Sequence, residues 1–124
     1  MPEHLCSLML FLYLFGGTIY FVLTVVETPI FIKSCKGILL QQEREELIDW
    51  LSHQPEVGDV IPGTNGLRKV RWARAGMSKR GGSRVIYLIQ YQREQVQLLI
   101  AYSKSKFDNL PPDFLRKLKE QYDA

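Results

Sequence analysis

The sequence predicts a single α+β domain in which helices pack on one face of an antiparallel sheet. The chain has 124 residues, 46% of them hydrophobic, which is enough for one hydrophobic core but not for two. Three short runs rich in β-branched and aromatic residues follow one another in the second half of the chain, separated by turn-forming residues. Segments with helical spacing of apolar residues lie before and after these runs. Such an order is typical of the α+β class.

The first 26 residues combine an apolar segment with the first expected strand. Leu5 to Val26 contains no Asp, Glu, Lys, Arg or His, and Gly16-Gly17 divides it. The second part is rich in β-branched and aromatic residues, which predicts a core strand over Ile19–Val26. Residues 1–17 would then be an apolar extension, such as a misassigned start codon produces, ahead of a domain of residues 18–124. A membrane anchor is the alternative, because the segment is long enough to cross a bilayer as a helix.

Two helices are expected next. Thr28-Pro29 has the pattern of an N-cap followed by proline in the first turn, and Gly37 has that of a C-terminal stop, which predicts a helix over Pro29–Lys36. A second helix is predicted over Gln41–His53, where Leu47, Trp50 and Leu51 recur at helical spacing. Gly58–Gly66 is dense in turn formers and is expected to be a loop.

The remaining elements are a three-stranded meander and a last helix. The strands are expected at Leu67–Ala73, Arg84–Tyr91 and Val96–Tyr102. The glycine-rich connection Arg74–Ser83 should be a basic loop, and Pro111-Pro112 should open the last helix. The predicted sheet therefore has one N-terminal strand plus the meander, with two N-terminal helices and one C-terminal helix.

The net charge of +3 hides a strong asymmetry along the chain. Residues 1–65 carry three basic and eight acidic side chains, residues 66–106 carry ten basic and one acidic, and residues 107–124 carry three basic and four acidic. The central segment therefore has a net charge of +9. A charge of this density indicates a polyanionic or acidic partner. A solvated basic face without any partner is the alternative.

Several function classes lack their usual signatures. The two cysteines, Cys6 and Cys35, form no metal-binding or disulfide pattern. This favours a reducing, cytoplasmic compartment. We expect neither a metal nor another cofactor. The sequence has no phosphate-binding glycine loop, dinucleotide fingerprint or serine-hydrolase elbow.

Strand alternation predicts where the basic residues lie. Lys69 and Arg71 share one face of their strand, and Arg84 shares a face with Ile86 in the next. Such a face, with Tyr87 or Tyr102 as a stacking ring or hydroxyl, suits single-stranded RNA. RNA cleavage by the neighbouring 2′-OH is also chemically possible, with Lys, Arg or Tyr replacing the usual histidines. The residues alone leave an RNA-binding and an RNA-cleaving protein open.

Each of these residues also has a purely structural interpretation. Lys69 and Arg71 could be solvated side chains of a strand edge, and Arg84, which follows two glycines, could bind backbone. Tyr87 and Tyr102 could be half-buried sheet residues, and Trp72 is expected in the core.

Three runs of sequence resemble a known family. They are GDVIPGTNGLRKVRWAR from Gly58 to Arg74, KRGGSRVIY from Lys79 to Tyr87, and LIAYSK from Leu99 to Lys104. Together they resemble the RelE/HigB toxins of bacterial type II toxin–antitoxin modules, and within these the HigB branch. The resemblance extends over about residues 20–122 and supports placing residues 1–17 outside the domain.

The resemblance implies a RelE-like fold and a metal-independent endoribonuclease that cleaves mRNA on the ribosome by 2′-OH attack. It further implies a helix-turn-helix antitoxin as partner, operator DNA bound indirectly through the complex, and no membrane partner. Mapped by motif, the catalytic candidates are Lys69, Arg71, Arg84 and Lys104. The RNA-binding candidates are Arg68, Arg74, Lys79, Arg80, Tyr87, Tyr102 and Lys106. A non-catalytic nucleic-acid-binding module is the alternative function.

Two departures from the family pattern stand out. Asn65 replaces a glycine, which a left-handed turn tolerates because Asn enters that conformation readily. Ser105-Lys106 replaces Asn-Glu, which removes a carboxylate and adds a cation near the active face. The identity of the general acid and base is therefore open.

Overall fold

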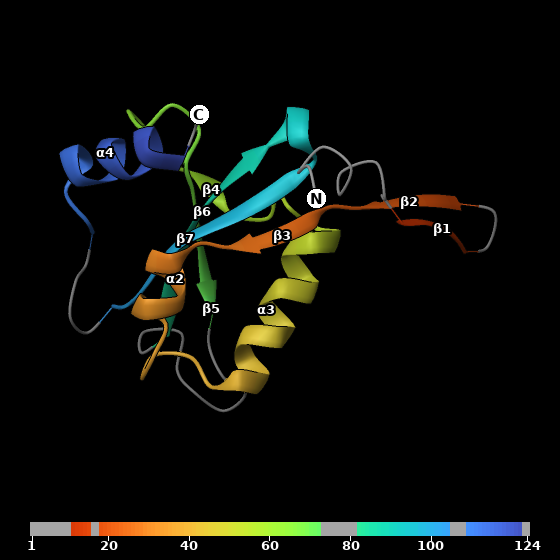
Figure 1. Cartoon of the computed structure of the whole chain (residues 1–124), viewed down its shortest axis with the longest axis horizontal. Coiled ribbons are helices and arrows are strands. Elements are labelled where there is room, and N and C mark those ends of the chain that lie inside the picture. Colours follow the sequence, from red (N-terminus) through yellow and green to blue (C-terminus); the bar gives the residue numbers. More distant parts are fainter. Residues whose placement is uncertain (1–10, 16–17, 73–81, 105–108, 123–124) are drawn as a thin grey trace.

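The structure is a computed structural model that describes residues 11–15, 18–72, 82–104 and 109–122. Its main sheet has five strands in the order β3-β7-β6-β5-β4 (Figure 1). The strands are β3 (Thr24–Glu27), β4 (Asp59–Val60), β5 (Arg68–Trp72), β6 (Ser83–Gln90) and β7 (Gln95–Ser103). The meander β5-β6-β7 is antiparallel, as the sequence predicts. The two-residue strand β4 lies inside the segment that was expected to be a loop, and it pairs with the start of β5.

The N-terminal strand differs from the prediction in its direction. β3 pairs with β7 in parallel, so the sheet is mixed rather than wholly antiparallel. Two helices follow β3 before the chain re-enters the sheet, and a long connection of this kind permits parallel pairing. At the end of β3, the Thr28 hydroxyl donates a hydrogen bond of 2.7 Å to the carbonyl of Leu98 in β7. The same oxygen accepts from the backbone N–H of Phe31 at 3.3 Å, so Thr28 both caps the first helix and fixes it to the sheet.

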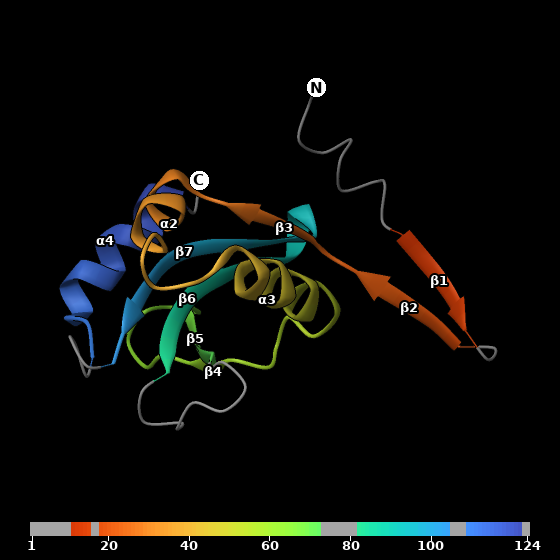
Figure 2. The same ribbon diagram turned by 90° about the horizontal axis from the view of Figure 1, so that it is seen from below.

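The helices cover both faces of the sheet, which corrects the expectation that they share one. Helices α2 (Pro29–Ser34) and α3 (Gln41–His53) pack on the side that we call the α3 face. Helix α4 (Pro112–Tyr122) packs on the opposite side, the α4 face (Figure 2). The bounds of α3 coincide with the predicted ones, and the Glu43 carboxylate accepts a hydrogen bond of 2.8 Å from the Leu40 N–H at its start.

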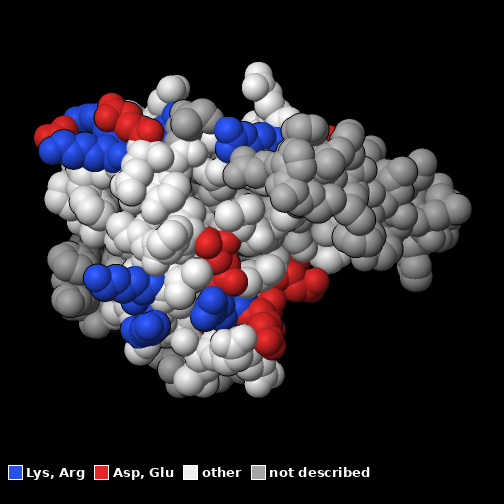
Figure 3. Space-filling model, viewed as in Figure 1, with Lys and Arg blue, Asp and Glu red and all other residues white. Residues whose placement is uncertain are grey.

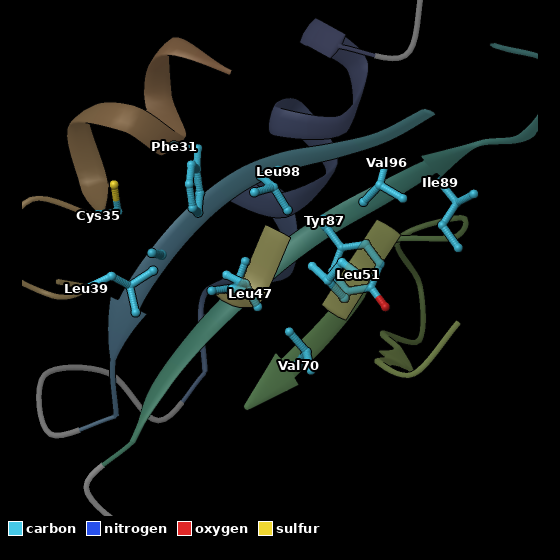
Figure 4. Packing of buried hydrophobic residues seen from close by; sticks show 12 residues of the cluster. Phe31, Cys35, Leu39, Leu47, Leu51, Val70, Tyr87, Ile89, Val96 and Leu98 are labelled. Carbon is cyan, nitrogen blue, oxygen red and sulfur yellow. The ribbon is translucent and has the colours of Figure 1, made fainter. Parts of the chain in front are cut away.

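Each face of the sheet has its own hydrophobic cluster. Along β6, Val85, Tyr87 and Ile89 point into the cluster on the α3 face, where Figure 4 shows Leu47 and Leu51 of α3 packed over the strands. Ile86 and Leu88 alternate with them and pack beneath α4. Neighbouring residues of β6 therefore lie in chemically different environments.

A β-bulge in β7 changes which face of the sheet the following residues of that strand point to. Ile86 pairs with Ile100 whereas Tyr87 pairs with Leu98, so Leu99 is the extra residue. Leu98 and Ala101, three residues apart, consequently both belong to the α3-face cluster, and Tyr102 belongs to the α4-face cluster. The bulge therefore places Tyr102 on the same side of the sheet as Arg84, its partner in β6.

The N-terminal apolar segment is divided among three strands. β1 (Phe11–Phe15) and β2 (Thr18–Val22) form an antiparallel two-stranded sheet that extends away from the main sheet in Figures 1 and 2. The strand predicted over Ile19–Val26 is thus split between β2 and β3. Residues 1–10 of the predicted extension lie outside the described residues. Among the helices that the structure describes, none is both long and apolar enough to span a bilayer.

Candidate nucleic-acid interface

One groove gathers the four side chains predicted to be catalytic. It has a volume of about 670 Å³, and we call it the cationic groove. It is lined by Trp50, Val57, Asp59, Lys69, Val70, Arg71, Arg84, Lys104 and Asn109. The basic residues come from β5, from β6 and from the residue that follows β7. Strand pairing therefore brings together residues that are up to 35 positions apart in the sequence.

The register of the sheet explains this convergence. Arg71 in β5 lies directly across from Arg84 in β6, and Arg84 lies across from Tyr102 in β7. Lys69 precedes Arg71 by two residues and Lys104 follows Tyr102 by two, so alternation directs all of them to the α4 face. Like charges placed directly opposite one another destabilise a sheet. The Arg71–Arg84 pair consequently costs stability in the free protein.

Among the described residues, the cations of the groove have no acidic partners. Lys69 Nζ donates a hydrogen bond of 3.1 Å to Asn109 Oδ1, a neutral group. In the part of the chain that the structure describes, no carboxylate forms an ion pair with Lys69, Arg71, Arg84 or Lys104, although Asp59 also lines the groove. Cations held together without counter-ions form a field that attracts an anionic ligand.

Basic residues elsewhere in the molecule are arranged differently. On the face shown in Figure 3, lysine and arginine side chains lie in separate groups, and some of these groups border acidic side chains. Arg44 forms an ion pair of 2.5 Å with Glu27, and Arg116 forms one with Asp113. These arginines are neutralised locally, whereas the arginines of the cationic groove have no such partner in the part of the chain that the structure describes.

Arg84 is the most deeply buried of the groove cations. Its residue is 4% exposed, and its guanidinium donates to the carbonyls of Gly82 and Ser83 at 3.3 and 3.5 Å. Burial lowers the pKa of Arg84, and the nearby charge of Arg71 lowers it further, while Tyr102 acts in the opposite direction. The backbone contacts agree with the structural interpretation of Arg84, but two long hydrogen bonds compensate a buried charge poorly.

Tyr102 lies behind Arg84 rather than on the surface. It is 4% exposed, so its ring is not the stacking platform that the sequence suggested. Burial raises the pKa of its phenol, and the charge of Arg84 opposes that rise. The ring lines a smaller cavity of about 210 Å³ beneath the start of α4. Lys69 and Asn109 line both this cavity and the cationic groove, so their hydrogen bond forms part of the wall between the two.

Tyr87 and Arg68 pair across β5 and β6 and lie on the α3 face of the sheet, opposite to the groove cations. Burial excludes base stacking by Tyr87, and RNA binding by Arg68 stays a prediction. Tyr87 is fully buried, and its hydroxyl donates to Pro55 O at 2.6 Å and accepts from Gly58 N at 2.9 Å. A ring with no exposed face cannot stack on a base. Burial raises the pKa of Tyr87, and the Gly58 N–H and the charge of Arg68 partly oppose this.

Arg68 binds the same loop as Tyr87. Its Nη1 donates to Gly58 O at 2.8 Å and to Glu56 O at 3.1 Å. A Cβ at Gly58 would lie 2.7 Å from the Tyr87 hydroxyl oxygen, which explains the glycine. Together these contacts hold the loop that carries Val57 and Asp59 to the rim of the groove.

Four predicted RNA-binding residues lie outside the described residues, namely Arg74, Lys79, Arg80 and Lys106. Conversely, the groove contains Trp50, Asp59 and Asn109, which the sequence did not single out. Trp50 has the helical spacing of a core residue, Asp59 lies in the run Gly58–Arg74 but was given no role there, and Asn109 stands in a turn-rich segment with no motif. Only the fold brings them to the cations. Among the described residues, no cluster of three or more His, Cys, Asp and Glu side chains could hold a metal ion.

Comparison with known proteins supports the fold. No protein-family model matches the chain. A solved structure of the toxin RelE from E. coli, in the free state and with two arginines replaced by alanine, is similar with a TM-score of 0.52. The two share 14% sequence identity, and the match covers 70% of this chain and 88% of the other. The chain therefore has a RelE-like α+β fold.

Proposed function

We propose that this chain is the toxin of a bacterial type II toxin–antitoxin module, of the RelE/HigB type and its HigB branch, and that it cleaves mRNA on the ribosome. The single observation that carries the proposal is the cationic groove. Lys69, Arg71, Arg84 and Lys104 meet there without a carboxylate partner among the described residues. The RelE-like fold and the three sequence runs that resemble the HigB branch support it.

The groove suits cleavage by the neighbouring 2′-OH. In that reaction the 2′ oxygen attacks phosphorus, the bond to the 5′ oxygen breaks, one proton leaves the 2′ oxygen and one reaches the 5′ oxygen. The extra negative charge of the phosphorane-like transition state would be stabilised by Arg71 and Arg84. Positive charge from arginine supplies what a metal would otherwise provide, so no step passes through a metal.

Proton transfer falls to the lysines in this proposal. Lys69 and Lys104 both line the groove. One of them, as the free amine, accepts the proton that leaves the 2′ oxygen, and the other, as the ammonium, donates a proton to the departing 5′ oxygen. The hydrogen bond from Lys69 to Asn109 orients one of them. Tyr102 would act through Arg84, its cross-strand partner, whose charge interacts with its phenol.

The proposal also defines the partners and the place of action. A cytoplasmic toxin of this kind would act on mRNA in the ribosome and be neutralised by a helix-turn-helix antitoxin. Operator DNA would be reached through the toxin–antitoxin complex. The cheapest supporting observation is a neighbouring gene for a small helix-turn-helix protein.

The decisive experiment maps new 5′ ends on ribosome-bound mRNA after addition of the full chain to a translation system. We expect wild type to create ends within codons, and Arg71→Ala and Arg84→Ala to reduce the rate of cleavage by about 100-fold or more. Arg93→Ala is the matched control, because Arg93 follows β6 at the end of the strand opposite to Arg84.

The outcomes separate the two candidate functions. RNA binding without new ends would identify a non-catalytic nucleic-acid-binding module. Full cleavage by both Arg71→Ala and Arg84→Ala would show that the cationic groove is not the active site.

A further inference from the structure

The cationic groove has an aromatic wall that the proposed chemistry does not use. Trp50, from α3, lines the groove together with Arg71, Arg84 and Lys69. Strand β4 pairs with β5 only at Arg68 and Lys69, so beyond Lys69 the groove extends past β4 toward α3. An indole and several cations that have no carboxylate partner among the described residues therefore border the same space.

Trp50 is held in place by a second indole. The ring centroids of Trp50 and Trp72 lie 5.5 Å apart with the planes tilted by 41°. Both side chains pack against the α3-face cluster, and Trp50 is half-buried. Trp72 does not line the groove. A ring fixed from one side by packing loses little further conformational freedom when a ligand covers it.

A half-buried tryptophan beside cations indicates one chemical class of ligand. An anion alone would satisfy Arg71 and Arg84 but would leave the indole uncovered. An apolar ligand would cover Trp50 and Val57 but would leave the charges without partners. A nucleotide supplies both a phosphate and a flat aromatic base, and stacking of bases on aromatic side chains is a general means of holding single-stranded nucleic acid.

We propose that Trp50 is the platform on which one base of the bound RNA stacks while the groove cations hold the adjoining phosphates. This inference rests on the proposed function for its ligand and adds a specific subsite to it. Trp50 is a positioning residue in this scheme, because it contacts the base and not the reacting phosphate. Stacking fixes the strand along the groove, so the same phosphate is presented to Arg71 and Arg84 in each bound molecule.

The sequence provides a direct spectroscopic test, because Trp50 and Trp72 are its only tryptophans. Trp72→Phe leaves Trp50 as the sole indole, and Trp50→Phe leaves Trp72. Each full-length variant is titrated with a short single-stranded RNA whose 2′-O-methyl groups prevent cleavage. An abasic oligonucleotide with the same number of phosphates is titrated in parallel.

We expect the RNA to quench the tryptophan emission of Trp72→Phe saturably, the abasic oligonucleotide to leave it unquenched, and Trp50→Phe to respond weakly to both. Trp50→Leu should bind the RNA about tenfold more weakly than wild type, the usual effect of losing one base–aromatic stack. Its affinity for the abasic oligonucleotide should be unchanged. Trp50→Phe, which keeps a ring, should retain most of the affinity, and thermal unfolding verifies that each variant is folded.

Equal quenching of Trp72→Phe by both oligonucleotides would overturn the inference, as would an unchanged RNA affinity of folded Trp50→Leu. Absence of RNA binding by wild type would overturn it as well. Quenching by RNA in a chain that makes no cuts in ribosome-bound mRNA would support the stacking site while removing the proposed enzymatic function. Cleavage of ribosome-bound mRNA by a chain whose Trp50 emission changes in none of the titrations would remove the stacking site alone.

Discussion

The two faces of β5 and β6 differ in how their polar groups are satisfied. On the α3 face, Tyr87 is fully buried, and its hydroxyl makes two hydrogen bonds to the loop at residues 55–58. On the α4 face, Arg84 is almost as deeply buried, faces Arg71, and has no carboxylate partner among the described residues. The same strands thus carry a hydrogen-bonded tyrosine on one side and, on the other, a charge without a carboxylate partner among the described residues.

Because of this difference, we expect each position of these strands to contribute mainly to stability or mainly to activity. Residues of the α3 face bury apolar surface, and Tyr87 fills the hydrogen bonds of its hydroxyl there, which stabilises the folded state. Residues of the groove face repel one another in the free protein and gain their partner only when an anion binds. We therefore expect substitutions on the α3 face to change the free energy of unfolding, and substitutions in the groove to change activity.

The largest expected effect on stability is that of Phe31→Ala. Phe31 is fully buried in the α3-face cluster, and its truncation leaves a cavity between α2 and the sheet. We expect a loss of about 3–5 kcal/mol in the free energy of unfolding, measured with urea. The folded fraction should bind RNA as wild type does. A selective loss of RNA affinity in folded protein would contradict the separation of the two faces.

The next largest effect is expected at Arg84, where a substitution should reduce activity and leave stability unchanged or higher. Arg84→Met keeps most of the side-chain volume and removes a buried charge that has only two long backbone hydrogen bonds. We expect cleavage to slow by about 100- to 1000-fold, the usual effect of losing one donor to a transition-state anion. The free energy of unfolding should be unchanged or higher, because apolar replacement of a buried charge is often stabilising. Cleavage by Arg84→Met at the wild-type rate would show that the unpaired charge has no catalytic use.

Tyr87→Phe should have a smaller effect, confined to stability. It leaves the buried N–H of Gly58 without an acceptor and the carbonyl of Pro55 without a donor. We expect a loss of about 1–3 kcal/mol in urea unfolding. Tyr91→Phe is the matched control, because Tyr91 is exposed and its bond to Glu56 can be replaced by water, so its effect should stay within about 0.5 kcal/mol. Equal losses in the two variants would mean that burial of the Tyr87 hydroxyl does not matter.

Periodicity predicted the elements of this fold better than their arrangement. The helix Gln41–His53 and the three meander strands follow from local spacing and turn residues, which act within a few positions of the chain. The parallel pairing of β3 with β7, and the placement of α4 on the opposite face from α3, depend on contacts between distant segments. Local patterns contain no information on such contacts.

The site was predicted in the same uneven way. Alternation predicted a common face for Lys69 and Arg71 within their strand, and the family resemblance selected Lys69, Arg71, Arg84 and Lys104 as catalytic candidates. The structure brings the four to one groove, and their catalytic role stays a prediction. Tyr87 was misjudged because a tyrosine in a strand has the same pattern whether its hydroxyl meets solvent or a buried loop. Trp50 was overlooked because its helical spacing is that of a core residue, and only the end of β4 leaves it at the groove.

The smallest expected effect is a fall in the free energy of unfolding at alkaline pH. It depends on one buried tyrosine on each face of the sheet, Tyr87 and Tyr102. Burial raises the pKa of both Tyr87 and Tyr102 above the ordinary value of about 10. Below that value both tyrosines are protonated in the folded and unfolded chains. Above it the unfolded chain ionises first, so the free energy of unfolding falls as the pH rises toward the folded pKa values. Tyr87→Phe and Tyr102→Phe should each reduce this fall, measured by urea unfolding across the alkaline range.

Arg84→Met then separates the two contributions. The charge of Arg84 lowers the pKa of Tyr102 but is not among the groups that act on Tyr87. Removing it should raise the pKa of Tyr102 further, which extends the alkaline loss of stability to higher pH, and Tyr102→Phe in the same background should abolish that extension. Tyrosinate absorbance, followed in both backgrounds, assigns the change to Tyr102. An extension that persists without the Tyr102 hydroxyl would mean that the two faces are electrostatically coupled through the sheet, against the separation inferred from their packing.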